Sequence, residues 1–186
     1  MRETSSSDAK DVVLHSIGRN VLNLQKMEGM FKSLAIYSEI SGPIEELPAL
    51  IAARKDEFSR KSLGQLVGDF IDRLAVELPD HLEDRQTDLP WIEFRSALLE
   101  SDDSKARLEN ALATLVAERN SLIHQKLLSF EIDSEEQCST LLSELDAQHE
   151  RIRPAYGYLL ERVNALNEMK VEIQEKIASK LGGLDL

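Results

Sequence analysis

A single cysteine, Cys138, stands in a chain of 186 residues. The chain can therefore form no intramolecular disulfide and no zinc site built on several cysteines. The scarcity of cysteine fits a reducing compartment. No uninterrupted apolar run approaches the roughly 18 residues that a membrane-spanning helix needs. The opening residues MRETSSSDAK contain no apolar stretch typical of a signal peptide. We therefore expect a cytoplasmic protein that makes no use of a membrane.

Positive charge is also scarce, because 22 lysines and arginines face 34 acidic residues and the formal net charge is −12. A surface this acidic repels phosphate backbones and anionic lipids, which excludes unspecific coating of nucleic acid. Any contact with RNA would need a local basic or polar pocket. The sequence contains no glycine-rich phosphate loop, no dinucleotide fingerprint and no Ser-His-Asp order. We expect no cofactor and no metal.

Hydrophobic residues make up 42% of the chain, which is enough to form one hydrophobic core. The length predicts one domain rather than two. The polar, serine-rich residues 1–10 predict a disordered tail, and residues 11–181 predict a single helical domain.

Apolar residues recur at helical spacing over residues 11–40, 44–60, 63–78, 104–128 and 134–180. Ser104 is the expected N-cap of the fourth of these helices, and Ser134 with Gln137 predicts a capping box for the last. Residues 91–98, WIEFRSAL, alternate in part and predict a strand or hairpin arm. The fold class is thus all-α: an antiparallel helical bundle with long N- and C-terminal helices and a short strand or hairpin insertion near 91–99.

The fourth helix contains the segment Glu118-Arg119-Asn120-Ser121-Leu122-Ile123-His124. At about 100° per residue, an apolar stripe has Arg119 at its middle. Its members are Leu108, Leu112, Leu115, Val116, Leu122 and Ile123. Asn120 and His124 are four residues apart and so lie one above the other at the edge of this stripe. The sequence therefore predicts a cation, an amide and an imidazole gathered at one place.

These three groups suit RNA cleavage without a metal. The reaction needs a base for the 2′-hydroxyl, an acid for the leaving 5′-oxygen and a cation beside the phosphate. Histidine titrates near neutral pH and fits the proton transfers, whereas Arg119 could hold two phosphate oxygens at once and Asn120 could orient the phosphate or the ribose. A single His124 does not easily serve both proton transfers, so a two-fold dimer would supply the second copy.

The residues Arg119-Asn120-Ser121-Leu122-Ile123-His124 resemble the Arg-X4-6-His motif of the HEPN superfamily. The resemblance implies a small all-α homodimer whose two motifs pair across the interface to form a metal-independent endoribonuclease. Such proteins often act as a toxin or in defence, with an antitoxin or regulatory protein as a further partner. A subfamily silenced by a nucleotidyltransferase antitoxin has tyrosine two residues after the histidine, where this chain has Lys126. The superfamily also includes non-catalytic members, so the alternative function is a helical interaction or nucleotide-binding module.

Two further residues are predicted to support the site. Glu28 lies on the apolar stripe of the first helix and either pairs with Arg119 or reaches a groove and water. Lys126 would add positive charge for RNA. Trp91 and Phe94 are interpreted as the inward face of the strand in preference to a base-stacking platform.

Overall fold

The computed structural model describes residues 6–74, 91–95 and 100–181 of the chain. Several predictions fall in part outside these residues: the first half of the N-terminal tail, the end of the helix over 63–78 and the end of the strand over 91–98. Within the described part, no helix combines the length and the apolar character that crossing a bilayer requires.

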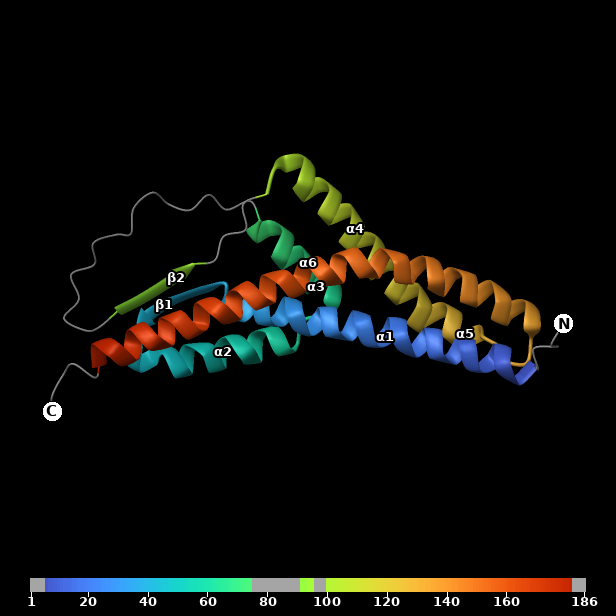
Figure 1. Cartoon of the computed structure of the whole chain (residues 1–186), viewed down its shortest axis with the longest axis horizontal. Coiled ribbons are helices and arrows are strands. Elements are labelled where there is room, and N and C mark those ends of the chain that lie inside the picture. The colour runs from blue at the N-terminus through green and yellow to red at the C-terminus, as the bar shows by residue number, and fades with distance from the viewer. Residues whose placement is uncertain (1–5, 75–90, 96–99, 182–186) are drawn as a thin grey trace.

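Helices dominate the architecture (Figure 1). The α-helices of the described residues are α1 (Ser6–Tyr37), α2 (Leu47–Ser59), α3 (Leu63–Arg73), α4 (Asp102–Ser121), α5 (Leu127–Ser129) and α6 (Glu135–Leu181). The short elements are the strands β1 (Glu39–Pro43) and β2 (Trp91–Arg95), the 3-10 turn η1 (Ile44–Glu46) and the π turn η2 (Leu122–Lys126). The prediction of a mostly helical fold with long first and last helices is confirmed.

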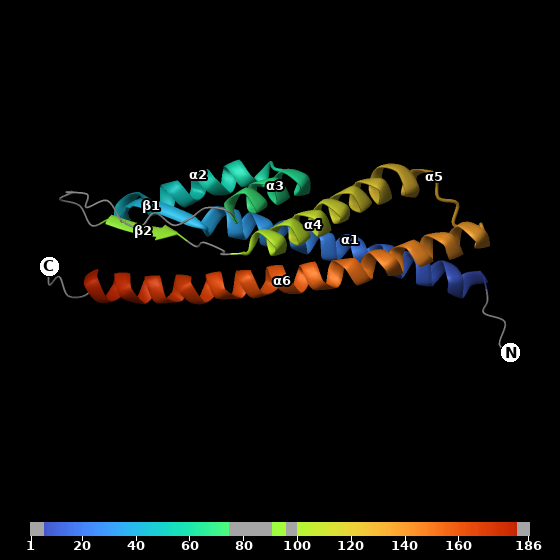
Figure 2. The same cartoon turned by 90° about the horizontal axis from the view of Figure 1, so that it is seen from above.

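The two longest helices, α1 and α6, run side by side in the same direction along the length of the molecule (Figures 1 and 2). Near their starts Asn20 bonds Gln148, and further along both helices Lys170 lies 3.3 Å from the centroid of the Tyr37 ring. The predicted antiparallel arrangement is therefore wrong for this pair, although α4 packs antiparallel to α6. Short connections force neighbouring helices to be antiparallel, but the whole middle of the chain separates α1 from α6 and leaves their relative direction free.

A buried amide fixes the register between α1 and α6. Asn20 is 0% exposed, and its side-chain nitrogen donates to the carbonyl of Leu145 at 2.7 Å and to Oε1 of Gln148 at 3.0 Å. Arg19 adds an ion pair with Asp146 at 3.0 Å. Because buried polar groups need partners, only one alignment of the two helices satisfies these side chains.

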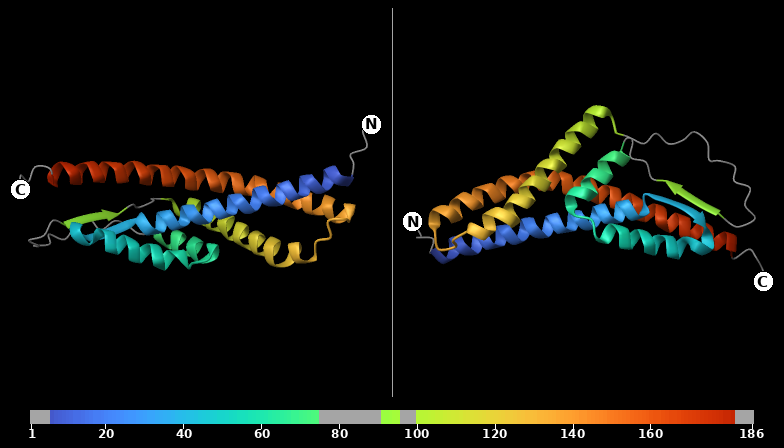
Figure 3. Two further views of the ribbon diagram at one scale, coloured as in Figure 1. Left: turned by 90° about the horizontal axis from the view of Figure 1, so that it is seen from below. Right: turned by 180° about the vertical axis from the view of Figure 1, so that it is seen from behind.

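The other helices pack on one side of the α1/α6 pair (Figures 2 and 3). The main core lies where α1 to α4 meet α6, and Phe31 of α1 contacts Phe70 of α3 edge to face with ring centroids 5.2 Å apart. A smaller core joins the first turns of α1 and α6 to Leu122. The described helices between α1 and α6 thus cover the apolar side of the long pair.

The strand predicted near 91–99 is confirmed for residues 91–95, but its partner is not local. β2 pairs antiparallel with β1, with Glu39 opposite Arg95 and Pro43 opposite Trp91. The first helix was expected to run to residue 40 and to end at Ser41-Gly42-Pro43, so no strand was predicted here, and Gly42 and Pro43 are poor strand formers. A two-stranded sheet that pairs along only five residues tolerates both of them. Phe94 packs against the main core, which agrees with the inward-facing interpretation.

Three helix starts differ in detail from the predictions. α1 begins at Ser6, so residues 6–10 of the predicted tail are helical. The N-cap of α4 is Ser101, whose hydroxyl accepts from the backbone N–H of Ser104 at 3.3 Å. The capping box before α6 is half formed: Ser134 accepts from the Gln137 N–H at 3.3 Å, but the Gln137 side chain accepts from Glu131 instead.

Candidate functional site

The motif segment lies where α4 passes through a π turn. The backbone N–H of Leu127 bonds the carbonyl of Leu122, five residues earlier, so one extra residue is accommodated in η2. In a regular α-helix, residues five apart point about 140° away from each other. The wider turn reduces this angle and brings His124 toward the side of the helix that carries Arg119. π turns inside α-helices often occur at functional sites.

Arg119, Asn120 and His124 border one open depression of about 460 Å³. Asn120 and His124 are exposed and Arg119 is half-buried. Nη1 of Arg119 donates to Oδ1 of Asn120 at 3.2 Å, which orders the guanidinium beside the amide. The predicted gathering of cation, amide and imidazole is therefore present within one subunit.

The expected position of Arg119 at the middle of a core-facing stripe is wrong. Leu112, Leu115 and Leu122 are buried, whereas Val116 and Arg119 are only half-buried. The described elements that cover α4 are mainly α3 and α6, and they cover only one side of it, so the guanidinium remains at the edge of the core. Its charge consequently stays accessible from the depression.

The start of α3 forms the opposite wall of the depression, through Ser62, Leu63 and Gly64. A Cβ at Gly64 would lie 3.4 Å from Cγ1 of Val116, so the first turn of α3 lies against α4 with room for little more than a methyl group between them. Ser62 and Gln65 form a reciprocal capping box that fixes this turn. None of these residues was predicted for the site, although the Ser-X-X-Gln spacing already marked a helix start in the sequence.

The electrostatics of the depression favour an anion. A helix N-terminus carries partial positive charge and attracts phosphate, and here the start of α3 faces the guanidinium of Arg119. Among the described residues, no carboxylate lies within ion-pair distance of Arg119. A phosphodiester could thus contact Arg119 and the first turn of α3 while His124 and Asn120 lie next to its reacting atoms.

The two residues predicted to support the site lie elsewhere. The Glu28 carboxylate accepts from Lys32 Nζ at 2.9 Å, one turn later on α1, and forms no ion pair with Arg119. Lys126 pairs with Glu144 of α6 and lines a different depression, between η2 and α6. It follows His124 by two residues, which places it on the other side of the helix. Neither side chain adds to the charge at Arg119.

Four basic residues, Arg54, Lys55, Arg60 and Lys61, lie close together in the sequence around the end of α2, and the last two are neutralised by neighbouring carboxylates. Arg60 pairs with Asp56, and Lys61 pairs with Glu57 at 3.3 Å and with Asp69 at 2.8 Å. The hydrogen bond to Asp69 raises the pKa of Lys61 above its usual value. These pairs favour a solvated, structural surface over a second contact for RNA.

An imidazole, an amide and a guanidinium therefore meet at one place, the depression between α3 and η2. Within residues 6–74, 91–95 and 100–181, no three histidine, cysteine or acidic side chains lie close enough together to hold a metal ion. No protein-family model, no curated protein and no solved structure matches this chain.

Proposed function

We propose that this protein is a HEPN-type, metal-independent endoribonuclease that acts in the cytoplasm as a homodimer. Its catalytic residues are Arg119, Asn120 and His124, and its physiological role is that of a toxin or defence effector. The observation that carries the proposal is that these three side chains border one open depression with the start of α3.

The reaction follows from the groups available. The ribose 2′-oxygen forms a bond to phosphorus while the bond from phosphorus to the 5′-oxygen breaks. One imidazole takes the 2′-hydroxyl proton, and a second proton donor protonates the departing 5′-oxygen. Arg119 and the first turn of α3 stabilise the charge that develops on the phosphate oxygens. Asn120 positions the phosphate or the ribose.

A second subunit completes the proton transfers in this scheme. Each depression contains one histidine, His124, among its lining residues, whereas the reaction uses a base and an acid. Leu128 follows His124 by one turn of the helix and is 81% exposed, so a subunit that covers it would remove apolar surface from water. A two-fold partner that covers Leu128 would also bring its own His124 close to this one.

The net charge of −12 restricts how RNA can bind. An acidic surface offers no general attraction, so binding depends on the few groups of the depression. We expect weak, salt-sensitive affinity and selectivity for a site at which one phosphate is accessible.

The chemistry of the product ends tests the proposal. Cleavage of a labelled RNA is expected to leave 2′,3′-cyclic phosphate and 5′-hydroxyl ends, because the nucleophile is the neighbouring 2′-oxygen. An RNA with a single 2′-deoxyribose at the cleavage position is expected to resist cleavage there. Products with 3′-hydroxyl and 5′-phosphate ends would exclude this mechanism.

Ser62 separates the structural role of the α3 start from its role toward phosphate. Ser62→Ala is expected to lower the free energy of unfolding by about 1 kcal/mol, because the N-cap is lost. Ser62→Asp keeps a capping oxygen and should retain wild-type stability in urea unfolding, yet it places a negative charge beside the depression. We expect Ser62→Asp to cleave RNA more slowly than wild type; an equal rate would show that phosphate does not approach the start of α3.

A non-catalytic interaction module is the second candidate, and the acidic surface favours it. In that case the depression would bind a nucleotide or a partner without cleaving RNA. Wild-type protein that binds RNA or nucleotide at Arg119 but leaves RNA intact would establish this alternative.

A further inference from the structure

We propose that a cavity between α1, α3 and the second half of α6 is a binding site for a small, mainly apolar molecule that carries one neutral hydrogen-bond acceptor. The cavity measures about 240 Å³. It lies at the end of α3, whereas the catalytic depression lies at the start of that helix. The inference therefore goes beyond the nuclease proposal and does not depend on it.

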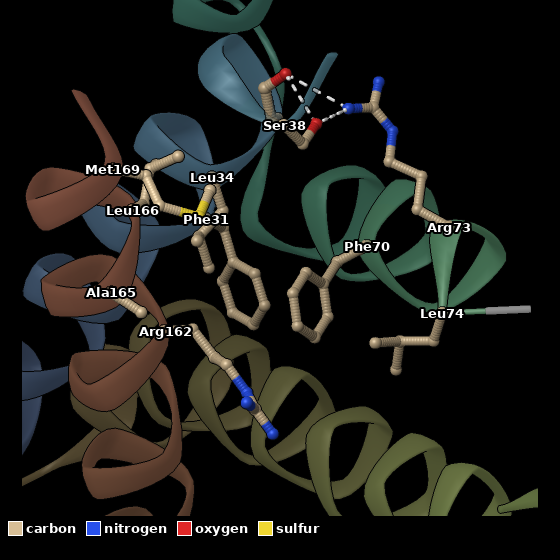
Figure 4. Close-up of a pocket in the computed structure, with 11 residues that line it drawn as sticks. Phe31, Leu34, Ser38, Phe70, Arg73, Leu74, Arg162, Ala165, Leu166 and Met169 are labelled. Carbon is tan, nitrogen blue, oxygen red and sulfur yellow. Dashed lines mark hydrogen bonds between the residues drawn. The ribbon is translucent and has the colours of Figure 1, made fainter. Parts of the chain in front are cut away.

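Apolar side chains make most of the cavity wall. Phe31 of α1 and Phe70 of α3 turn their rings toward each other, and Leu166 and Met169 approach from α6 (Figure 4). An apolar cavity of about 150 Å³ accepts benzene, so this one has room for a two-ring aromatic compound. Because an empty apolar cavity destabilises a fold, an apolar occupant is favoured.

Two arginines line the cavity, and they differ in direction and in hydrogen bonding. Arg73 points away from the phenylalanine rings (Figure 4) and donates to the Ala35 carbonyl at 3.1 Å and to the Ser38 hydroxyl. Arg162 extends past the rings on their other side (Figure 4). Its Nε is buried and has no hydrogen-bond partner among the described residues. Buried donors in native proteins are almost always satisfied, so the unpaired Nε–H indicates where a ligand acceptor would lie.

The surroundings of Arg162 favour a neutral acceptor over an anion. Nη2 of Arg162 donates to Oε1 of Glu100 at 3.2 Å, and the hydroxyl of Tyr158 donates to the same oxygen at 3.1 Å. The guanidinium charge is thus already balanced, and the Glu100 carboxylate would repel a second anion. A carbonyl oxygen accepts from Nε without that repulsion. The expected ligand is an aromatic or medium-length ketone, ester or amide.

Three naphthalene compounds test this chemistry on the full-length protein. In calorimetric or fluorescence titrations we expect 2-acetylnaphthalene to bind saturably at one site, about fivefold more tightly than naphthalene because of the added hydrogen bond. The anion 2-naphthoate should bind more weakly than 2-acetylnaphthalene. Absence of saturable binding by 2-acetylnaphthalene, or tightest binding by 2-naphthoate, would overturn the proposal.

Two variants locate the site. Ala165 lines the cavity but is exposed, so Ala165→Phe covers the cavity without disturbing the core and should weaken binding at least about tenfold. The matched control is Asn167→Leu, an exposed position on the opposite side of α6, which should leave binding unchanged. Arg162→Lys keeps the charge that faces Glu100 but removes Nε–H, and it should abolish the preference for 2-acetylnaphthalene over naphthalene. Unchanged binding by Ala165→Phe, with thermal unfolding like wild type, would show that the ligand binds elsewhere.

Discussion

Substitution of His124 by alanine is expected to slow RNA cleavage by about a thousandfold, since one residue serves as general base or acid in the proposed reaction. His124 is exposed, so its removal should leave the fold intact. The rate is measured on a labelled RNA under single-turnover conditions, beside the thermal unfolding of each protein. If expression of the wild type inhibits growth, the variant should relieve that inhibition.

His15→Ala is the matched control for this substitution. His15 is also exposed but lies near the start of α1. The His15→Ala variant should cleave RNA at the wild-type rate. An equal loss of cleavage rate in His15→Ala and His124→Ala would indicate a contaminating nuclease or a general effect on the protein. Undiminished cleavage by His124→Ala would show that His124 takes no part in the mechanism.

Arg119 allows its charge to be separated from its geometry. Arg119→Ala is expected to reduce cleavage about a hundredfold or more, because a cation that stabilises the developing phosphate charge is lost. Arg119→Lys keeps the charge but cannot contact two phosphate oxygens together or donate in the same way to Asn120, so it should recover only part of the rate. Full activity of Arg119→Lys would show that the bidentate contact is unnecessary.

Asn20→Ala is expected to lower the free energy of unfolding by about 2 kcal/mol, because it leaves Oε1 of Gln148 buried without its donor. Asn20 is 0% exposed and Gln148 is 5% exposed, so water cannot replace the lost bond. Urea unfolding followed by circular dichroism measures the change. The half-exposed Asn23 on the same helix provides the control, and Asn23→Ala should lie within about 0.5 kcal/mol of wild type.

A double substitution tests whether Asn20 and Gln148 act as one unit. Asn20→Ala with Gln148→Ala should destabilise the protein by less than the sum of the two single changes, since the double variant removes both partners of the bond and leaves neither side chain buried without the other. If the changes in the free energy of unfolding are strictly additive, the two side chains contribute independently and the register of α1 against α6 is set by apolar packing.

Helical periodicity was sufficient to predict every long helix of this fold, because the spacing of apolar residues reflects local geometry. Starts and ends of helices were predicted less accurately, as the cap at Ser101 shows. The parallel direction of α1 and α6 could not be predicted, because it depends on contacts such as Asn20 with Gln148 between residues more than 100 positions apart. The strand over 39–43 was missed for a similar reason: its partner lies about 50 residues later.

In the candidate site, too, local features could be predicted from the sequence, whereas features that depend on distant residues could not. Arg119, Asn120 and His124 lie on one segment, so their proximity could be predicted from spacing alone. Their exposure could not, since it depends on how little of α4 its neighbours cover. The π turn over Leu122–Lys126 was not predicted either. The opposite wall at Ser62 comes from a helix that begins about 60 residues earlier.

The rate of RNA cleavage by purified protein in excess EDTA tests most directly whether the three motif residues form a metal-independent nuclease. The wild type is expected to cleave as fast with EDTA as with added magnesium, and His124→Ala is expected to be inactive under both conditions. Loss of wild-type cleavage in EDTA, or equal cleavage by wild type and His124→Ala, would contradict this function.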